Sequence, residues 1–345
     1  METIWFWFVA FLLTMYVLLD GFDLGAGALH LVVARTDEER RTVLRSIGPV
    51  WDGNEVWLIA GGGTLYFAFP ALYASSFSGF YLPLMLVLWL LVLRGISIEF
   101  RSHLENRVWA PFWDVVFAGA SLLLALFLGA ALGNVVRGVP LGEAGWFFVP
   151  LWTDFLVGPD PGVLDFYTLS VGLTALAALA LHGALWLSHK TEGDVQARAR
   201  RAAGRLWWAV VGGTLLITAL TWWVQPLVPR HLGERPWAWV FPALALAGLA
   251  AIRRALAARK DLPGFLGSCA FLAGMLASAA VSLYPYVLPS VGPGPGLTVH
   301  TAAAARSGLA IGLAWWIPGM ALALAYVVFL YRRFRGKVSL EGEGY

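Results

Sequence analysis

The hydrophobic positions of this 345-residue chain form long apolar stretches that alternate with short polar connections. An apolar stretch of about 20 residues is long enough to cross the hydrocarbon core of a membrane as a helix. We therefore expect each such stretch to be a transmembrane helix. The nine expected helices cover residues 5–33, 50–70, 78–98, 112–136, 164–188, 206–227, 236–254, 263–286 and 305–331.

The composition agrees with an all-α integral membrane protein and excludes a soluble one. Hydrophobic residues make up 59% of the chain and charged residues only 13%, whereas about a quarter of a typical soluble domain is charged. The connections are too short for a folded soluble domain, and nothing indicates nucleic-acid binding. The single cysteine, Cys269, excludes a disulfide framework or a cysteine-ligated metal centre within this chain.

The distribution of Lys and Arg predicts the orientation of the helices. Short loops rich in these residues stay in the cytoplasm. All but four of the 24 basic residues lie in alternate connections, near the ends of the helices that lead into them, or in the C-terminal tail. We therefore expect the N-terminus outside and the C-terminus in the cytoplasm. The four exceptions are Arg137, Arg230, Arg235 and Arg306.

A degenerate repeat divides the chain. At an offset of 156 residues, seven residues recur without a gap over 25 positions, from Gly27 to Trp51 and from Gly183 to Trp207. The copies begin in the first and fifth helices, so they enter the membrane in the same direction, as parallel repeats do. We expect two parallel-related four-helix units plus one peripheral helix. The boundaries are 1–138 for the first unit, 139–163 for an outside loop, 164–287 for the second unit, 288–304 for an outside Gly/Pro loop, and 305–345 for the ninth helix and basic tail.

Two pairs of carboxylates lie in the first repeat and have no acidic counterparts in the second. Asp20 and Asp23 share one face of the first helix, and Asp52 and Glu55 occupy the first turns of the second. All four fall toward the cytoplasmic side. A charge deep in a bilayer costs roughly 2.5–3.5 kcal/mol and usually marks function, and carboxylates spaced along helices are the usual parts of proton relays.

Each pair of carboxylates also has a structural interpretation. Asp52 followed three residues later by Glu55 has the spacing of a capping box at the start of a helix. Asp20 and Asp23 lie in mid-helix, where no cap is available, and their structural alternative is pairing with an arginine of a neighbouring helix.

Other polar residues favour structural roles. Arg94, Glu99 and Arg101 end the third helix, and we expect them to form an ion-pair cluster at the cytoplasmic interface. Among six histidines, His30 and His182 lie within helices. Haem ligation by two histidines needs opposed imidazoles on adjacent helices, and no second pair supports it. We therefore expect no haem or metal site in this chain.

Several motifs resemble a known family, subunit II of cytochrome bd quinol oxidases. The match covers most of the chain in order, and its most specific part is WDGNEVWL at residues 51–58. The other matching motifs are DGFDLGAG at 20–27, FSGFY at 77–81, GISIEFR at 95–101, WD at 113–114, GN at 133–134 and YPYVLPS at 284–290.

The resemblance implies a haem-free subunit of a terminal oxidase in the cytoplasmic membrane of a bacterium or archaeon. Such an enzyme is a quinol:oxygen oxidoreductase that reduces dioxygen to water with cytoplasmic protons. The resemblance also implies that subunit I holds two b-type haems and one d-type haem and oxidises the quinol. Subunit I would be the partner of this chain in a one-to-one complex. No catalytic residue is expected in this chain. Asp20 and Asp52 match residues of a proton route, with Asp23 and Glu55 in support. Trp57 matches a residue on a suggested oxygen path, its structural alternative being an aromatic of the membrane belt.

Two alternatives to this function remain open at the level of sequence. A secondary transporter with parallel repeats would have a substrate site at the repeat interface, but the acids are confined to one repeat. A purely structural subunit would support the haem-bearing chain through an apolar face. The sequence also leaves open which quinone is used, whether a structural quinone or membrane lipid binds this chain, and whether a small single-span subunit joins the complex.

Overall fold

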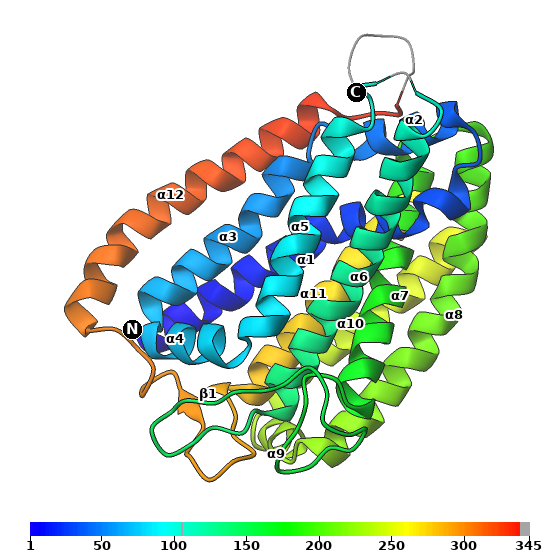
Figure 1. The fold of residues 1–345 in the computed structure, drawn as a ribbon. Helices are drawn as coiled ribbons and strands as arrows, with labels where there is room; N and C mark the ends of the chain where they lie inside the picture. Colours follow the sequence, from blue (N-terminus) through cyan, green and yellow to red (C-terminus); the bar gives the residue numbers. More distant parts are fainter. Residues whose placement is uncertain (105, 339–345) are drawn as a thin grey trace.

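Long α-helices form most of the structure. The computed structural model describes residues 1–104 and 106–338 (Figure 1), so the end of the expected basic tail, 339–345, lies outside the described residues. The helices are α1 (Glu2–Val33), α2 (Asp37–Ile47), α3 (Trp51–Ala68), α4 (Pro70–Gly79), α5 (Tyr81–Phe100), α6 (Trp109–Arg137), α7 (Phe166–Lys190), α8 (Gly193–Val224), α9 (Leu227–Glu234), α10 (Val240–Ala257), α11 (Asp261–Leu283) and α12 (Arg306–Arg333), with a short 3-10 turn at Pro236–Trp239.

Eight helices within the described residues are long and apolar enough to cross a membrane: α1, α5, α6, α7, α8, α10, α11 and α12. The expected second span differs. Helices α3 and α4 are long and apolar enough to cross a membrane only when they are taken together, and the chain bends by 119° between them. Pro70 lacks the amide hydrogen that would continue α3, and it begins α4 instead. Nine spans therefore result only if α3 and α4 count as one broken span.

The two ends of the bundle carry different structures (Figure 1). The end called here the loop end holds the N-terminus, residues 138–165, α9, and strands β1 (Tyr286–Leu288) and β2 (Leu297–Thr298). The opposite end, the α2 end, holds α2 and the end of α12. The all-α prediction is wrong at one place: β1 and β2 pair antiparallel where an irregular Gly/Pro loop was expected at 288–304.

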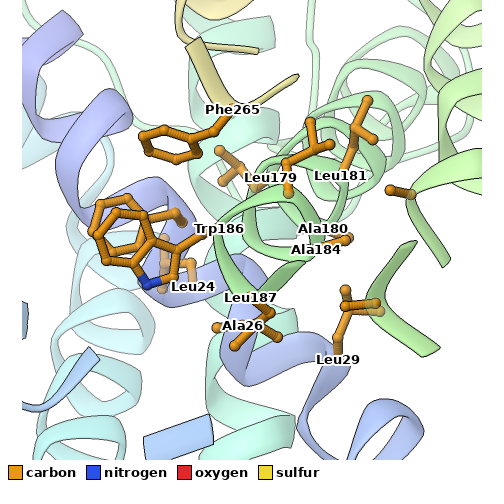
Figure 2. Close-up of a cluster of buried hydrophobic side chains, with 14 of the residues drawn as sticks. Leu24, Ala26, Leu29, Leu179, Ala180, Leu181, Ala184, Trp186, Leu187 and Phe265 are labelled. Carbon is orange, nitrogen blue, oxygen red and sulfur yellow. The ribbon is translucent and has the colours of Figure 1, made fainter. Parts of the chain in front are cut away.

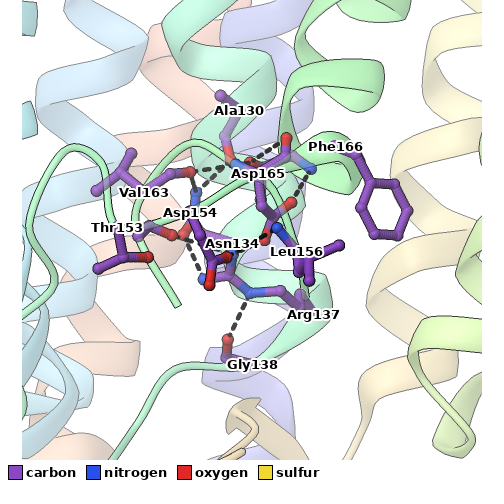
Figure 3. A network of polar contacts seen from close by, with 12 residues as sticks. Ala130, Asn134, Arg137, Gly138, Thr153, Asp154, Leu156, Val163, Asp165 and Phe166 are labelled. Carbon is purple, nitrogen blue, oxygen red and sulfur yellow. Dashed lines mark hydrogen bonds and ion pairs between the residues drawn. The ribbon is translucent and has the colours of Figure 1, made fainter. Parts of the chain in front are cut away.

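The long loop at the loop end is anchored by a buried polar network between α6 and α7 (Figure 3). Arg137, the last residue of α6, forms an ion pair with Asp165, the N-cap of α7. The side-chain amide of Asn134 donates to the carbonyl oxygens of Ala130 and Val163 at 2.8 Å each. Because buried polar groups need partners, this network holds both ends of the loop against the bundle.

At the α2 end, contacts of Glu39 hold the start of α2 against the bundle. Its carboxylate accepts hydrogen bonds from the amides of Arg35 and Thr36 and pairs with Arg198 of α8. Burial alone would raise the pKa of Glu39, but these hydrogen bonds and the arginine outweigh it and lower that pKa. Arg198 also donates to the carbonyl of Val33 at the end of α1. Glu39 and Arg198 thus connect α1, α2 and α8.

Equivalent helices of the two repeats make equivalent contacts. Helix α1 packs against α3, α6 and α11, and α7 packs against α8, α11 and α6. Helix α5 packs against α6 as α10 packs against α11. Helices α1 and α7 also cross each other, so the two first helices of the repeats meet at the centre. Helix α12 lies at the edge of the bundle beside α3 (Figure 1).

The main apolar core lies where α1 crosses α7 (Figure 2). Leu24 of α1, Trp186 of α7 and Phe265 of α11 are among its buried side chains. The helices approach closely because both have glycine at the crossing. A Cβ atom on Gly25 would lie 1.9 Å from the carbonyl oxygen of Leu179. The backbones therefore leave no room for a side chain there.

Replacing Gly25 with Ala is expected to destabilise the subunit by more than the roughly 1–3 kcal/mol of ordinary overpacking, because the obstructing atom belongs to the backbone. The thermal unfolding midpoint and yield of the purified complex measure this effect. Gly119→Ala is the matched control, since nothing lies within 4 Å of its Cβ position. Equal stability of the two variants would contradict the close crossing.

Candidate functional site

A line of buried polar side chains follows one face of α1. Tyr16, Asp20, Asp23 and His30 are spaced by four, three and seven residues, which places them on the same side of a helix. All four are buried, and Asp20, Asp23 and His30 have no exposed surface. Helices α3, α5 and α6 supply their polar neighbours, so the line runs inside the first repeat.

Asp20 forms a bidentate ion pair with Arg94 of α5. Nη1 and Nη2 of Arg94 donate to Oδ2 and Oδ1 of Asp20 at 2.9 and 2.5 Å. Both side chains are fully buried. The carboxylate of Glu55 on α3 lies 3.8 Å from the same guanidinium, and its side chain is 22% exposed. Asp20 therefore makes the pairing with an arginine of a neighbouring helix that its structural alternative expects.

Asp23 is buried without an ion-pair partner among the described residues. Its Oδ2 accepts a hydrogen bond from the side-chain amide of Asn54 at 2.8 Å. The Asn54 oxygen in turn accepts from the hydroxyl of Tyr331 on α12 at 3.0 Å. The other oxygen of Asp23, Oδ1, has no hydrogen-bond partner in the described protein. Asp23 therefore has an acceptor site left over, whereas both oxygens of Asp20 are bound to Arg94.

A second polar cluster surrounds Asp114 of α6, nearer the α2 end. The carboxylate of Asp114 lies 2.7 Å from Nε2 of His30 and accepts from Arg101 at 2.6 Å and from Arg40 at 3.0 Å. Arg101 also pairs with Asp37, at the start of α2, at 2.7 Å. This cluster connects the interior of the bundle to the half-exposed surface beside α2.

Ser121 of α6 lies between the two clusters. A Cβ atom on Gly27 would lie 2.1 Å from its hydroxyl oxygen, and Gly27 is on α1 between Asp23 and His30. The Ser121 hydroxyl and Nδ1 of His30 are buried and have no hydrogen-bond partner in the described protein. Buried polar atoms of this kind are usually met by ordered water. The Ser121 hydroxyl and Nδ1 of His30 are therefore unpartnered polar atoms between the Asp23 and Asp114 clusters.

The structure brings Asp20, Asp23 and Glu55 together and leaves Asp52 at the surface. The capping-box interpretation of Asp52 and Glu55 is wrong. Helix α3 begins after Val50, which is its N-cap and has no side-chain cap hydrogen bond. Asp52 thus lies inside the first turn of α3, and its side chain is exposed.

The expected cluster of Arg94, Glu99 and Arg101 does not form. Arg94 pairs with Asp20 and Arg101 with Asp114, while Glu99 is exposed and makes no ion pair within the described residues. The physical reason is the helical face. Positions seven apart, such as 94 and 101, point the same way into the bundle, whereas position 99 points outward.

Trp57 is buried rather than placed at a membrane belt. It is 5% exposed and lies in an apolar cluster with Leu12 and Tyr16. Sequence reasoning gave no role to Asn54 or Asp114, although both lie in the family-like motifs. The signal that could have identified them is an uncompensated polar residue in an otherwise apolar span.

One of the two fully buried histidines, His182, has no ring nitrogen free for a haem iron. Both ring nitrogens of His182 are hydrogen-bonded, Nδ1 to Ser268 at 2.7 Å and Nε2 to the Leu18 carbonyl at 3.0 Å. His30 uses Nε2 for Asp114, and its Nδ1 has no hydrogen-bond partner in the described protein. No group of three His, Cys, Asp or Glu side chains within the described residues is arranged to hold a metal ion.

The family model described as cytochrome bd terminal oxidase subunit II matches residues 1–334. The chain belongs to this family. The resemblance drawn from the motifs is thereby confirmed, and the transporter alternative is set aside. As a cytochrome bd subunit II, the chain is a multi-pass membrane protein and a member of an oxidoreductase complex of the respiratory chain.

Relatives of this subunit II cover nearly its whole length. The probable cytochrome oxidase subunit 2 of Haemophilus influenzae is 33% identical over 97% of this chain and 94% of its own. The cytochrome bd ubiquinol oxidase subunit 2 of Bacillus subtilis is 30% identical over 98% of this chain and 97% of its own. A solved structure of bd oxidase from Geobacillus thermodenitrificans has a chain that aligns with a TM-score of 0.73 at 19% identity. That alignment covers 96% of this chain and 98% of the solved one, and it shows the same fold.

Proposed function

We propose that this subunit II takes up protons at its α2 end and passes them to the interior of the complex, where subunit I reduces dioxygen with electrons from quinol. The carrying observation is a graded series of carboxylates. Asp52 is exposed, Glu55 is partly buried one turn further along α3, and Asp20 and Asp23 are fully buried on α1. Arg94 links Glu55 to Asp20 electrostatically. Carboxylates at increasing depth are what a relay into a membrane requires.

In this proposal the α2 end faces the cytoplasm, as the distribution of Lys and Arg predicts. Subunit I holds two b-type haems and one d-type haem, which supply the redox chemistry, and this chain holds none. Its own residues bind and position protons. Trp57, buried beside Leu12 and Tyr16, is proposed to line an oxygen path through the apolar side of the same region.

We further infer that residues 1–138 and 164–287 are two four-helix units with a common origin. The repeat in sequence and the equivalent helix contacts support this organisation. Because the carboxylates occur only in the first unit, proton uptake belongs to that unit, and the second unit supports it through the α1 and α7 crossing.

Replacing Asp52 with Asn tests the relay. Asp52 is exposed and makes no ion pair in the described chain, so assembly and the haem spectrum of the complex should be unchanged. Quinol-driven oxygen consumption is expected to fall roughly a hundredfold, the low end of what loss of a proton-transfer group costs. Glu99→Gln is the matched control, because it removes an exposed carboxylate outside the series.

Full turnover in both Asp52→Asn and Glu55→Gln would contradict the relay and leave a structural role for the subunit. A changed haem spectrum in either variant would instead indicate that the carboxylates act in assembly.

A further inference from the structure

A basic pocket opens at the α2 end, on the side of the bundle formed by the second repeat. It is a cavity of about 490 Å³ between the start of α8, the end of α10 and the start of α11. Its lining contains five basic residues and one acid. They are Arg200, Arg201, Arg253, Arg259 and Lys260, with Asp261 as the acid.

The positive charge of this pocket is mostly uncompensated. Asp261 is bound by Arg200 through two hydrogen bonds of 2.9 and 2.6 Å. The other four cations have no ion-pair partner within the described part of the chain. One of them, Arg253, instead lies over the ring of Trp207, with its guanidinium carbon 5.7 Å from the ring centre. The pocket therefore holds about four positive charges that favour an anion.

The surroundings of the pocket indicate where the anion comes from. The pocket lies at the ends of three helices that are apolar enough to cross a membrane. Further along these helices, apolar side chains point outward: Trp208 is 62% exposed, Leu262 46% and Leu266 56%. A molecule with a phosphate at one end and acyl chains at the other matches both the basic pocket and the exposed apolar side chains beside it.

We propose that this pocket binds the headgroup of an anionic phospholipid, with its acyl chains against the exposed apolar side chains of α8 and α11. Arginine suits this task because its planar guanidinium binds two phosphate oxygens at once. The site lies outside the carboxylate series, so it is independent of the proposed proton relay.

The test compares two double variants of the intact oxidase complex. Arg201→Gln with Arg253→Gln removes two exposed cations from the pocket, and Arg332→Gln with Arg333→Gln removes two exposed cations from the end of α12 as the matched control. Each delipidated complex is titrated with cardiolipin, phosphatidylglycerol or phosphatidylcholine, and bound lipid is counted by native mass spectrometry. Inorganic phosphate is added as competitor in a separate series.

The pocket variant is expected to bind cardiolipin and phosphatidylglycerol roughly thirtyfold more weakly than the unmodified complex, since each basic residue contributes roughly fivefold. The control variant should bind them normally. Unchanged binding by the pocket variant would overturn the proposal, and so would equal binding of phosphatidylcholine. Displacement of lipid by inorganic phosphate alone would show a free-phosphate site instead. Unchanged thermal unfolding of the lipid-free variants would exclude misfolding as the cause.

Discussion

Replacing Arg94 with Met is expected to destabilise subunit II by about 3–5 kcal/mol, which is the usual cost of breaking a buried ion pair from one side. The carboxylate of Asp20 would remain fully buried with no cation beside it. Glu55 would also lose its nearest positive charge, now 3.8 Å away. The yield of assembled complex, followed by its haem spectrum, and the thermal unfolding midpoint measure the loss.

The double variant Asp20→Leu with Arg94→Met separates structure from proton transfer. Replacing both partners of a buried pair by apolar residues of similar size is often neutral for stability. The double variant should therefore recover assembly. If Asp20 carries protons, oxygen consumption will stay low in the assembled complex. Full activity would contradict a proton-carrying role for Asp20, and instability equal to that of the single variant would contradict the ion-pair account.

The helices and the unusual carboxylates could be predicted because their signals are local. Apolar length and the positions of Lys and Arg identify most spans. Asp20 and Asp23 stand out because a charge in mid-span is expensive wherever the helix is packed. The bend between α3 and α4 is harder to predict from the sequence. Apolar residues continue on both sides of Pro70, and a hydropathy profile does not show a change in the direction of a helix.

The partners of these carboxylates could not be predicted, because they depend on which helices pack together. Arg94 was grouped with Glu99 by proximity in sequence, yet it binds Asp20, 74 residues away. Asp114 binds His30 across 84 residues. Such pairs follow from the face that α5 and α6 turn toward α1, and one sequence does not specify that face.

Replacing Asp23 with Asn is expected to lower oxygen consumption roughly a hundredfold or more while the complex still assembles. Asp23 has no ion-pair partner to lose within the described residues, and asparagine has nearly the same shape. Its side-chain oxygen can still accept the hydrogen bond from Asn54. What the substitution removes is the buried carboxyl group that would bind and release a proton in the proposed relay. Quinol-driven oxygen consumption and the haem spectrum of the purified complex measure the two effects separately.

The matched controls for Asp23 are Tyr331→Phe and Asp23→Glu. Tyr331→Phe removes the hydroxyl that donates to Asn54 and leaves the carboxylate in place, so its effect on turnover should be small. Asp23→Glu keeps a carboxylate and should recover part of the rate lost in Asp23→Asn. If Asp23→Asn turns over normally while Asp52→Asn is slow, protons reach Asp20 through Glu55 without Asp23. If Asp23→Asn, Asp23→Glu and Tyr331→Phe are all equally slow, the hydrogen bonds between Asp23, Asn54 and Tyr331 serve to hold α1, α3 and α12 in position and not to carry protons.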